Sequence, residues 1–204
     1  ILDVVGLEES FSFLTDQGRL ASFGQDFDNR LGCLPNSGDN DCIPDVSGLA
    51  EGKAKYITSS DRHVLLIDSA KKAFGYGKDD RFQIPTMPSG DYIRPFQGPL
   101  TSKNISHIRG LQQATIFLTE EGQLYGVGMQ DGHRLCTMAT TGTGTISHIA
   151  HGERVQRIER IYGGFVFQDI KGGVYACGRN PGFTTQAITP GPFLVESVEG
   201  FQID

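Results

Sequence analysis

The chain has 204 residues and a formal net charge of −6, and its 27 glycines are nearly twice the ordinary share of that residue. This length can bury a substantial core, as one large domain or two small ones. No run of about 18 apolar residues is present, so we expect no membrane-spanning helix, and the acidic balance argues against direct nucleic-acid binding. Because the chain begins at Ile1 rather than at a methionine, we expect a fragment or a processed product.

Four windows of twelve residues align along the chain without gaps. They read FLTDQGRLASFG (13–24), LIDSAKKAFGYG (66–77), FLTEEGQLYGVG (117–128) and FQDIKGGVYACG (167–178). Their last residues are Gly24, Gly77, Gly128 and Gly178, which are spaced by 53, 51 and 50 residues. A near-constant period of this size is the signature of stacked homologous units. The sequence therefore predicts a repeat protein.

Each window predicts a β-hairpin. Apolar residues lie two positions apart at the start of the window, as in Phe11 and Phe13, and this spacing places both side chains on one face of a strand. A short turn follows, and it ends where glycine would supply a positive φ. The residues at this turn position are Gly18, Lys71, Gly122 and Gly172. A second strand then runs to the closing glycine of the window.

A second pattern precedes each hairpin, with apolar residues spaced by three. It is clearest in Ile105, Ile108 and Leu111, and it recurs with Val155, Ile158 and Ile161. Weaker or earlier copies are Ala54/Ile57/Ser60 and Ile1/Val4/Leu7. We interpret each copy as a short strand or turn that enters the unit, with a helical turn as the alternative. No window sustains helical periodicity, so the fold class is all-β.

The period and the hairpins predict a β-propeller. We expect a single repeat domain over residues 1–204, with units at 1–53, 54–104, 105–154 and 155–204. The windows at 13–24 and 117–128 resemble the regulator-of-chromosome-condensation repeat, whose usual tryptophan before the closing glycine is replaced here by Phe23, Tyr76, Val127 and Cys177. The family's following glycine-leucine-glycine element is matched by NRLGC (29–33) and partly by GHRLCT (132–137).

The resemblance also bears on the number of blades. Propellers of that family typically have seven blades, whereas four units are present. We therefore expect four blades of a larger propeller, or an open, partial propeller that another chain or a second copy completes.

No pattern of catalytic, cofactor-binding or metal-binding residues survives inspection. The glycine-rich string TTGTGTIS (140–147) lacks the lysine of a phosphate-binding loop. The histidines, at 63, 107, 133, 148 and 151, show no zinc-protease spacing, and the acidic residues at 39, 41 and 45 lack the calcium-loop pattern. We expect no enzyme activity, no cofactor and no metal.

The four cysteines form no C-x-x-C pair, which gives little support to a structural zinc site. Cys33 and Cys42 bracket an eight-residue loop and would form a disulfide in an exported protein. We favour reduced thiols and an intracellular location, cytoplasmic or nuclear. Cys177 then serves as a small buried thiol.

The function that the sequence favours is a non-enzymatic scaffold for protein–protein interaction. The long segments 25–52, 78–104 and 129–154 share one phase of the repeat, so we expect them to cluster on one side and to carry the binding residues. The candidates for partner binding are Asp26, Asp28, Arg30, Asp39, Asp41, Asp79, Asp80, Arg81, His133 and Arg134.

The family resemblance implies an alternative function. The founding member of that family promotes nucleotide exchange on a small nuclear GTPase and docks on nucleosomes. The alternative is therefore a guanine-nucleotide exchange factor, although no loop here shows a recognisable wedge for dislodging a nucleotide. The expected partners are proteins, either a small GTPase or neighbouring subunits of a complex.

Overall fold

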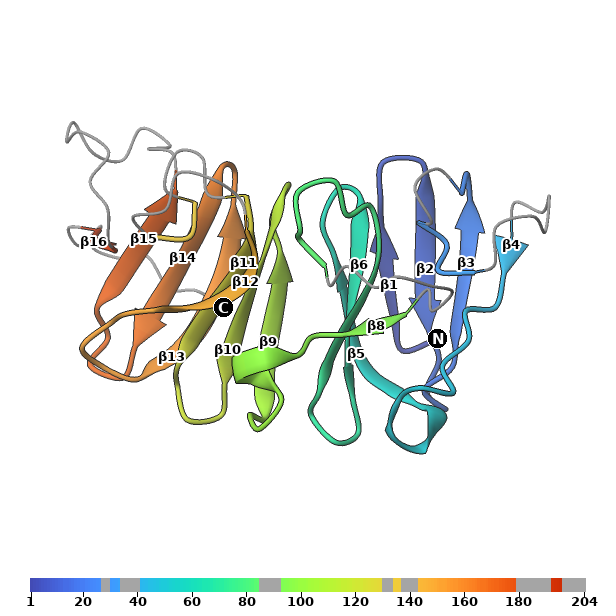
Figure 1. Cartoon of the computed structure of the whole chain (residues 1–204), viewed down its shortest axis with the longest axis horizontal. Coiled ribbons are helices and arrows are strands. Elements are labelled where there is room, and N and C mark those ends of the chain that lie inside the picture. Colours follow the sequence, from blue (N-terminus) through green and yellow to red (C-terminus); the bar gives the residue numbers. More distant parts are fainter. Residues whose placement is uncertain are drawn as a thin grey trace.

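The computed structural model describes residues 1–26, 30–33, 41–84, 93–129, 134–136, 143–178 and 192–195. In these ranges the chain forms four antiparallel sheets of four strands each, which follow one another along the sequence (Figure 1). Two short 3-10 turns, η2 (Ala50–Gly52) and η3 (Gly98–Leu100), are the only helical elements of the described ranges. The all-β prediction is confirmed.

Each sheet is one blade, and its strands run outward in chain order from the first to the fourth. Blade 1 contains β1 (Asp3–Gly6), β2 (Ser10–Leu14), β3 (Leu20–Gly24) and β4 (Asp41–Cys42). Blade 2 contains β5 (Ala54–Ser59), β6 (His63–Asp68), β7 (Ala73–Gly77) and β8 (Arg94–Pro95). Blade 3 contains β9 (Ile105–Gly110), β10 (Ala114–Thr119), β11 (Leu124–Gly128) and β12 (Thr143–Ile149). Blade 4 contains β13 (Val155–Ile161), β14 (Gly164–Asp169), β15 (Val174–Gly178) and β16 (Phe193–Leu194).

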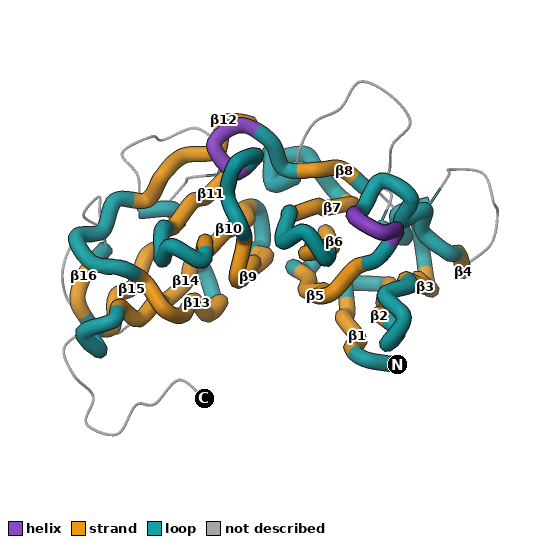
Figure 2. Tube along the Cα trace, turned by 90° about the horizontal axis from the view of Figure 1, so that it is seen from below, coloured by secondary structure: helices purple, strands orange, loops and turns teal. Residues whose placement is uncertain are grey.

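The four blades stand side by side in an open arc (Figure 2). The first strands β1, β5, β9 and β13 lie on the concave side, and the fourth strands β8 and β12 lie on the convex side. Blades 1 and 4 stand at opposite ends of this arc and do not meet. The expectation of an open, partial propeller is confirmed.

The central hairpin of each blade forms as the sequence predicts. The residue at the turn has a positive φ in every blade, including Lys71 at 60° where the other blades have glycine. A second feature of this turn recurs in all four blades. The side chain at the end of the second strand, or of the residue just after it, accepts a hydrogen bond from the backbone N–H four residues later. The accepting side chains are Thr15, Asp68, Thr119 and Asp169. A side-chain oxygen at this position closes the turn locally.

The apolar spacing of three is explained by a β-bulge at the start of the first strand. In blade 2, Ala54 pairs with Asp68 and Tyr56 pairs with Ile67, so Lys55 is an extra residue. The same irregularity recurs in β9 and β13. An extra residue shifts the strand by one position, which lets Ala54 and Ile57 both be buried. The strand interpretation is confirmed, and the helical alternative is wrong.

The closing glycines are required by space as well as by conformation. Gly24 has a φ of 116°, and a Cβ built on it would lie 2.4 Å from the carbonyl oxygen of Glu9. The same contact with the start of the second strand occurs at the closing glycine of each other blade. The close approach locks the third strand against the second at the end of the hairpin.

Adjacent blades bury their flat faces against each other in three apolar clusters. Leu14 and Leu20 of blade 1 meet Leu66 and Tyr76 of blade 2, and all four side chains are fully buried. The corresponding positions form the cluster between blades 2 and 3 and the cluster between blades 3 and 4. Burial of this apolar surface is the main force that holds the arc together.

The expectation of reduced thiols is wrong, because the structure contains two disulfides, Cys33–Cys42 within blade 1 and Cys136–Cys177 between blades 3 and 4. Cys136 and Cys177 are 41 residues apart in the sequence, and only the stacking of blades brings their Cα atoms to 5.2 Å. Disulfides persist mainly in oxidising compartments. The location of the protein stays a prediction.

Candidate protein-binding face

One end of the arc gathers two kinds of connection, and we call it the loop face. It comprises the turns between the first and second strands (7–9, 60–62, 111–113 and 162–163) and the described residues that follow each third strand (25–26, 30–33, 78–84 and 134–136). It forms the upper edge of the molecule in Figure 1. The closing glycines mark where each blade enters it.

The expectation that the long segments lie wholly on one side is wrong. Each segment contains the fourth strand of its blade, β4, β8 or β12, and so crosses from the loop face to the opposite end. Ala50, in the part after β4, donates its N–H to Asp68 at the far end of the blade-2 hairpin. Only the part of each segment before the fourth strand belongs to the loop face.

Two buried residues anchor each described connection after a third strand. The seventh residue after the closing glycine is aliphatic and at most 1% exposed, and it is Leu31, Ile84 or Leu135. The residue before it is polar and also buried, and it is Arg30, Gln83 or Arg134. Such paired anchors hold a connection in one conformation, which lowers the entropy cost of binding a partner.

The anchoring arginines reach the neighbouring turns of the loop face. Arg30 forms an ion pair with Glu8 at 3.4 Å, and Arg134 donates to the side chain of Gln113 at 3.4 Å. Both arginines were candidate binding residues, and both lie beneath the loop face rather than on it. Their side chains therefore support the face and are not available as surface contacts.

Three other candidates lie on the loop face with exposed side chains. Asp26 accepts a hydrogen bond from the Leu31 N–H at 3.1 Å. Asp80 accepts one from Gln83, whose side chain in turn accepts the Arg81 N–H at 2.8 Å. The anchor Gln83 therefore holds the Asp80 carboxylate and the backbone of Arg81 in place.

The remaining candidates are placed differently or lie outside the described residues. The Asp79 side chain is 12% exposed and lies 3.8 Å from Arg94, and burial raises its pKa to about 6. Asp41 begins β4 and is exposed. The residues at 28, 39 and 133, namely Asp28, Asp39 and His133, lie outside the described residues.

Sequence reasoning missed a chain of charges across the turns of the loop face. Arg62 lies 3.0 Å from Glu8, the Glu8 N–H donates to the carbonyl oxygen of Asp61, and Asp61 pairs with Arg160 at 2.5 Å. These contacts join blades 1, 2 and 4. These charged residues all lie near the end of a first strand or in the turn after it, where side chains of successive blades converge. Their shared place in the repeat is the sequence signal that could have identified them.

A second group of charges joins three blades on the concave side. Arg109 of β9 donates two hydrogen bonds to Glu159 of β13 and one to the hydroxyl of Tyr56 of β5. The geometry with Glu159 is bidentate, which is the strongest form of this pair. The group joins the inner strands of blades 2, 3 and 4.

A buried histidine lies between blades 2 and 3. His63 is fully buried, with Nδ1 2.5 Å from the Ser60 hydroxyl and Nε2 3.2 Å from the Thr115 hydroxyl. Burial and the nearby Arg160 lower its pKa to about 3. Because no part of the ring reaches the surface, the Ser60–His63 pair cannot contact a substrate, and it serves as a polar bridge between blades.

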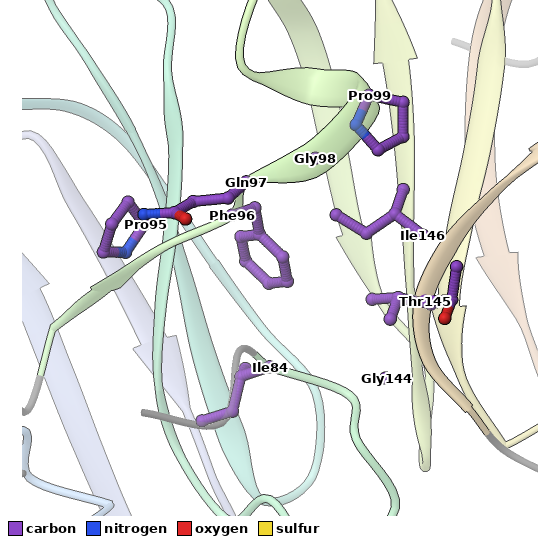
Figure 3. A pocket seen from close by; sticks show the side chains of 10 residues that line it. Ile84, Pro95, Phe96, Gln97, Gly98, Pro99, Gly144, Thr145 and Ile146 are labelled. Carbon is purple, nitrogen blue, oxygen red and sulfur yellow. The ribbon is translucent and has the colours of Figure 1, made fainter. Parts of the chain in front are cut away.

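A cavity of about 300 Å³ opens between blades 2 and 3 near the convex rim (Figure 3). One wall is formed by residues around β8 and η3, including Phe96 and Pro99, and the other by Gly144 and Ile146 of β12. Its lining has no charged side chain, so it offers no acid or base and is suited to an apolar group. Among the described residues, no group of three His, Cys, Asp or Glu could hold a metal ion, and no helix could cross a membrane.

No protein-family model matches the chain, and no curated protein matches its sequence. Solved structures do match. Human WBSCR16 superposes with a TM-score of 0.79 at 13% identity, covering 94% of this chain and 50% of that one. Prp20p from Saccharomyces cerevisiae superposes with a TM-score of 0.78 at 15% identity, covering 97% of this chain and 51% of that one. Yeast RCC1 (Prp20) bound by Kap60 gives the same TM-score and identity.

The chain has an RCC1-like β-propeller fold. The resemblance of its repeats to those of the regulator of chromosome condensation is thereby confirmed in three dimensions. The chain spans about half the length of the solved chains that it matches. At these low identities the likeness establishes the fold, and it assigns no binding residue.

Proposed function

We propose that the chain is a non-enzymatic scaffold that binds another protein through its loop face. The observation that carries the proposal is the repeated anchoring of the connections after the third strands. An aliphatic and a polar residue are buried at the same two positions of three successive blades. This arrangement holds exposed charges such as Asp26, Asp80 and Arg81 on a fixed base.

Fixed exposed charges suit recognition of a protein surface. Because the connections of the loop face are already ordered, a partner that binds them does not have to order them, and less free energy is lost on binding. Exposed charges of both signs within one blade favour a partner of complementary pattern and increase the association rate. The cavity near the convex rim shares the anchor Ile84 with this face, and the proposal does not depend on it.

Charge reversal on the loop face tests the proposal. We expect Asp80→Lys combined with Arg81→Glu to weaken binding of a captured partner at least tenfold, measured by titration with the purified partner. The matched control is Asp16→Lys with Arg19→Glu, two exposed residues of the blade-1 hairpin turn at the opposite end. Equal affinity of both variants and the unchanged chain would refute the loop face as the binding surface.

A second candidate function is guanine-nucleotide exchange on a small GTPase. It is supported by the likeness to Prp20p, whose structure is described together with its binding to Gsp1p and histones. A nucleotide-release assay against a panel of small GTPases separates the two functions. Stimulated release that the loop-face variant abolishes would favour exchange, whereas binding without stimulated release would favour the scaffold.

A further inference from the structure

The chain contains one Asn-X-Ser/Thr sequence in which X is not proline, formed by Asn104, Ile105 and Ser106. This tripeptide is the acceptor motif for N-linked glycosylation. It is used only where the site is on the surface and the protein enters a secretory compartment. A tripeptide of this kind also arises by chance, so the motif needs support from the structure on both conditions.

The motif lies at an accessible place in the fold. Asn104 directly precedes β9, at the end of the arc that carries the hairpin turns, opposite the loop face. Asn104 and Ser106 are both exposed, whereas Ile105 is 2% exposed and packs in the apolar cluster between blades 2 and 3. The alternation of a strand therefore keeps the two side chains of the motif outside and turns the variable middle one inward.

The Asn104 amide can carry a sugar without losing its contact in the folded protein. Its Nδ2 donates one hydrogen bond among the described residues, to the Glu120 carboxylate at 3.2 Å. The Asn104 carbonyl oxygen accepts the Glu120 N–H at 2.9 Å, which holds the backbone in place. An amide nitrogen carries two hydrogens, and N-glycosylation replaces only one of them. The bond to Glu120 can therefore remain beside the sugar.

The cysteines provide a second, independent observation. All four are paired, as Cys33–Cys42 and Cys136–Cys177. Disulfides form and persist in oxidising compartments, and one of these is the lumen of the endoplasmic reticulum, where N-linked glycosylation takes place. The motif and the disulfides are unrelated in sequence and lie in different parts of the fold, yet both fit the same compartment.

We propose that Asn104 is N-glycosylated in an oxidising secretory compartment. Nδ2 of Asn104 attacks the anomeric carbon of an oligosaccharide that a polyprenyl pyrophosphate carries. A carbon–nitrogen bond forms, the bond from that carbon to the pyrophosphate oxygen breaks, and the lipid pyrophosphate leaves. Nδ2 gives one proton to the transferase. The proposal departs from the intracellular location that we expect from the sequence.

The order of the chain favours the reaction during synthesis. In the folded protein the Ser106 hydroxyl donates to the Leu118 carbonyl oxygen at 3.0 Å, and Asn104 contacts Glu120. Leu118 and Glu120 follow the motif in the sequence by 12 and 16 residues. The motif therefore leaves the ribosome before the residues that later engage it, and a transferase meets it unpaired.

The position of Asn104 separates this modification from binding at the loop face. A glycan at the hairpin-turn end leaves the loop face uncovered, so the scaffold function does not depend on it. Nucleotide exchange on a nuclear GTPase is different, because a glycosylated chain would not share a compartment with that partner.

The mass of the protein isolated from its own cells tests the proposal. We expect peptide-N-glycosidase, applied to the denatured protein, to lower the mass and to leave aspartate at position 104, because this enzyme converts a glycosylated asparagine to aspartate. Mass spectrometry of the peptides then locates the change. Unmodified Asn104 as the only form after this treatment would overturn the proposal.

Variants of the motif test whether the sugar depends on it. Asn104→Gln and Ser106→Ala should each abolish the mass loss, whereas Ser106→Thr keeps the motif and should preserve it. The matched control is Ser102→Ala, an exposed serine just outside the motif, and it should also preserve the mass loss. A mass loss that survives in Ser106→Ala would place the sugar elsewhere and overturn the proposal.

Discussion

The junction between blades 1 and 2 and the junction between blades 3 and 4 solve the same packing problem with different chemistry. In the first, the eighth residue after the closing glycine is Gly32, and a Cβ built on it would lie 2.8 Å from the ring of Tyr76. In the second, that residue is Cys136, and it is bonded to Cys177, which occupies the position of Tyr76. Both Gly32 and Cys136 have a left-handed backbone, with φ of 71° and 53°.

The two junctions share a backbone arrangement and differ in the side chains that fill it. The backbone brings one blade's connection to within contact of the next blade's third strand in both places. A large ring then demands glycine as its partner, whereas a small thiol leaves room for a second cysteine. The hydroxyl of Tyr76 also forms hydrogen bonds with Ser12 and Ser22 of blade 1. Cys177, at the equivalent position, has no such hydroxyl.

The largest effect is expected when the disulfide between blades 3 and 4 is removed. Cys136→Ser with Cys177→Ser opens a loop of 41 residues, and the chain-entropy model gives a loss of about 4 kcal/mol in the free energy of unfolding. Denaturant unfolding of the oxidised protein measures it. Cys33→Ser with Cys42→Ser, which opens only 9 residues, should cost about 2.5 kcal/mol. A larger loss for the shorter loop would contradict this account.

The next effect tests the junction between blades 1 and 2. Gly32→Ala introduces a Cβ that overlaps the Tyr76 ring and forces an L-residue into a left-handed backbone. These two costs together should lower the free energy of unfolding by about 3 kcal/mol. Gly48→Ala is the matched control, because a Cβ there meets nothing within 4 Å. Similar melting curves for the two variants would show that the contact with Tyr76 is not tight.

Local patterns in the sequence were enough to predict the blades but not the junctions. The alternation of Phe11 with Phe13 and the glycine at the turn depend on residues close in sequence, so the hairpins and the all-β class could be predicted. The apolar spacing of three was also informative, although its cause, a bulge, became visible only in the pairing of β5 with β6.

The features that could not be predicted depend on how one blade stacks on the next. Nothing close to Cys136 in the sequence indicates Cys177, and the pair follows only once blade 4 is placed on blade 3. Arg30 and Arg134 were assigned to the binding surface because they lie in long segments between hairpins, where binding residues concentrate. Their burial follows from the turns that they reach, at Glu8 and Gln113.

At the junction between blades 2 and 3, the buried His63 makes the free energy of unfolding depend on pH. The pKa of His63 is lowered to about 3 in the folded protein by burial and by Arg160, against about 6.5 in an unfolded chain. Between these values the unfolded chain binds a proton that the folded chain does not, so stability falls as the pH drops below 6.5. The contribution is about 1.4 kcal/mol per pH unit.

A variant isolates this contribution of His63. We expect His63→Gln to flatten the dependence of the free energy of unfolding on pH between about 6.5 and 5, measured by denaturant titration at each pH. His148→Gln, which replaces an exposed ring, serves as the control and should keep the slope of the unchanged protein. An unaltered slope in His63→Gln would mean that the ring is protonated in the folded state.

The smallest effect tests the hydroxyl of Tyr76, which distinguishes the junction of blades 1 and 2 from the other two. The hydroxyl donates to Ser12 at 2.9 Å and lies 3.3 Å from Ser22, and the two serines also bond each other at 2.8 Å. Tyr76→Phe keeps the ring against Gly32 and removes only the hydroxyl. Because Ser12 and Ser22 retain each other as partners, the loss should be about 1 kcal/mol rather than the larger cost of an unpaired buried group. Chemical unfolding measures the loss, and Tyr162→Phe, at a 93% exposed side chain, should show none. If Tyr76→Phe cost as much as Gly32→Ala, the hydroxyl network rather than the fit of ring to glycine would be the main stabilising contact of this junction.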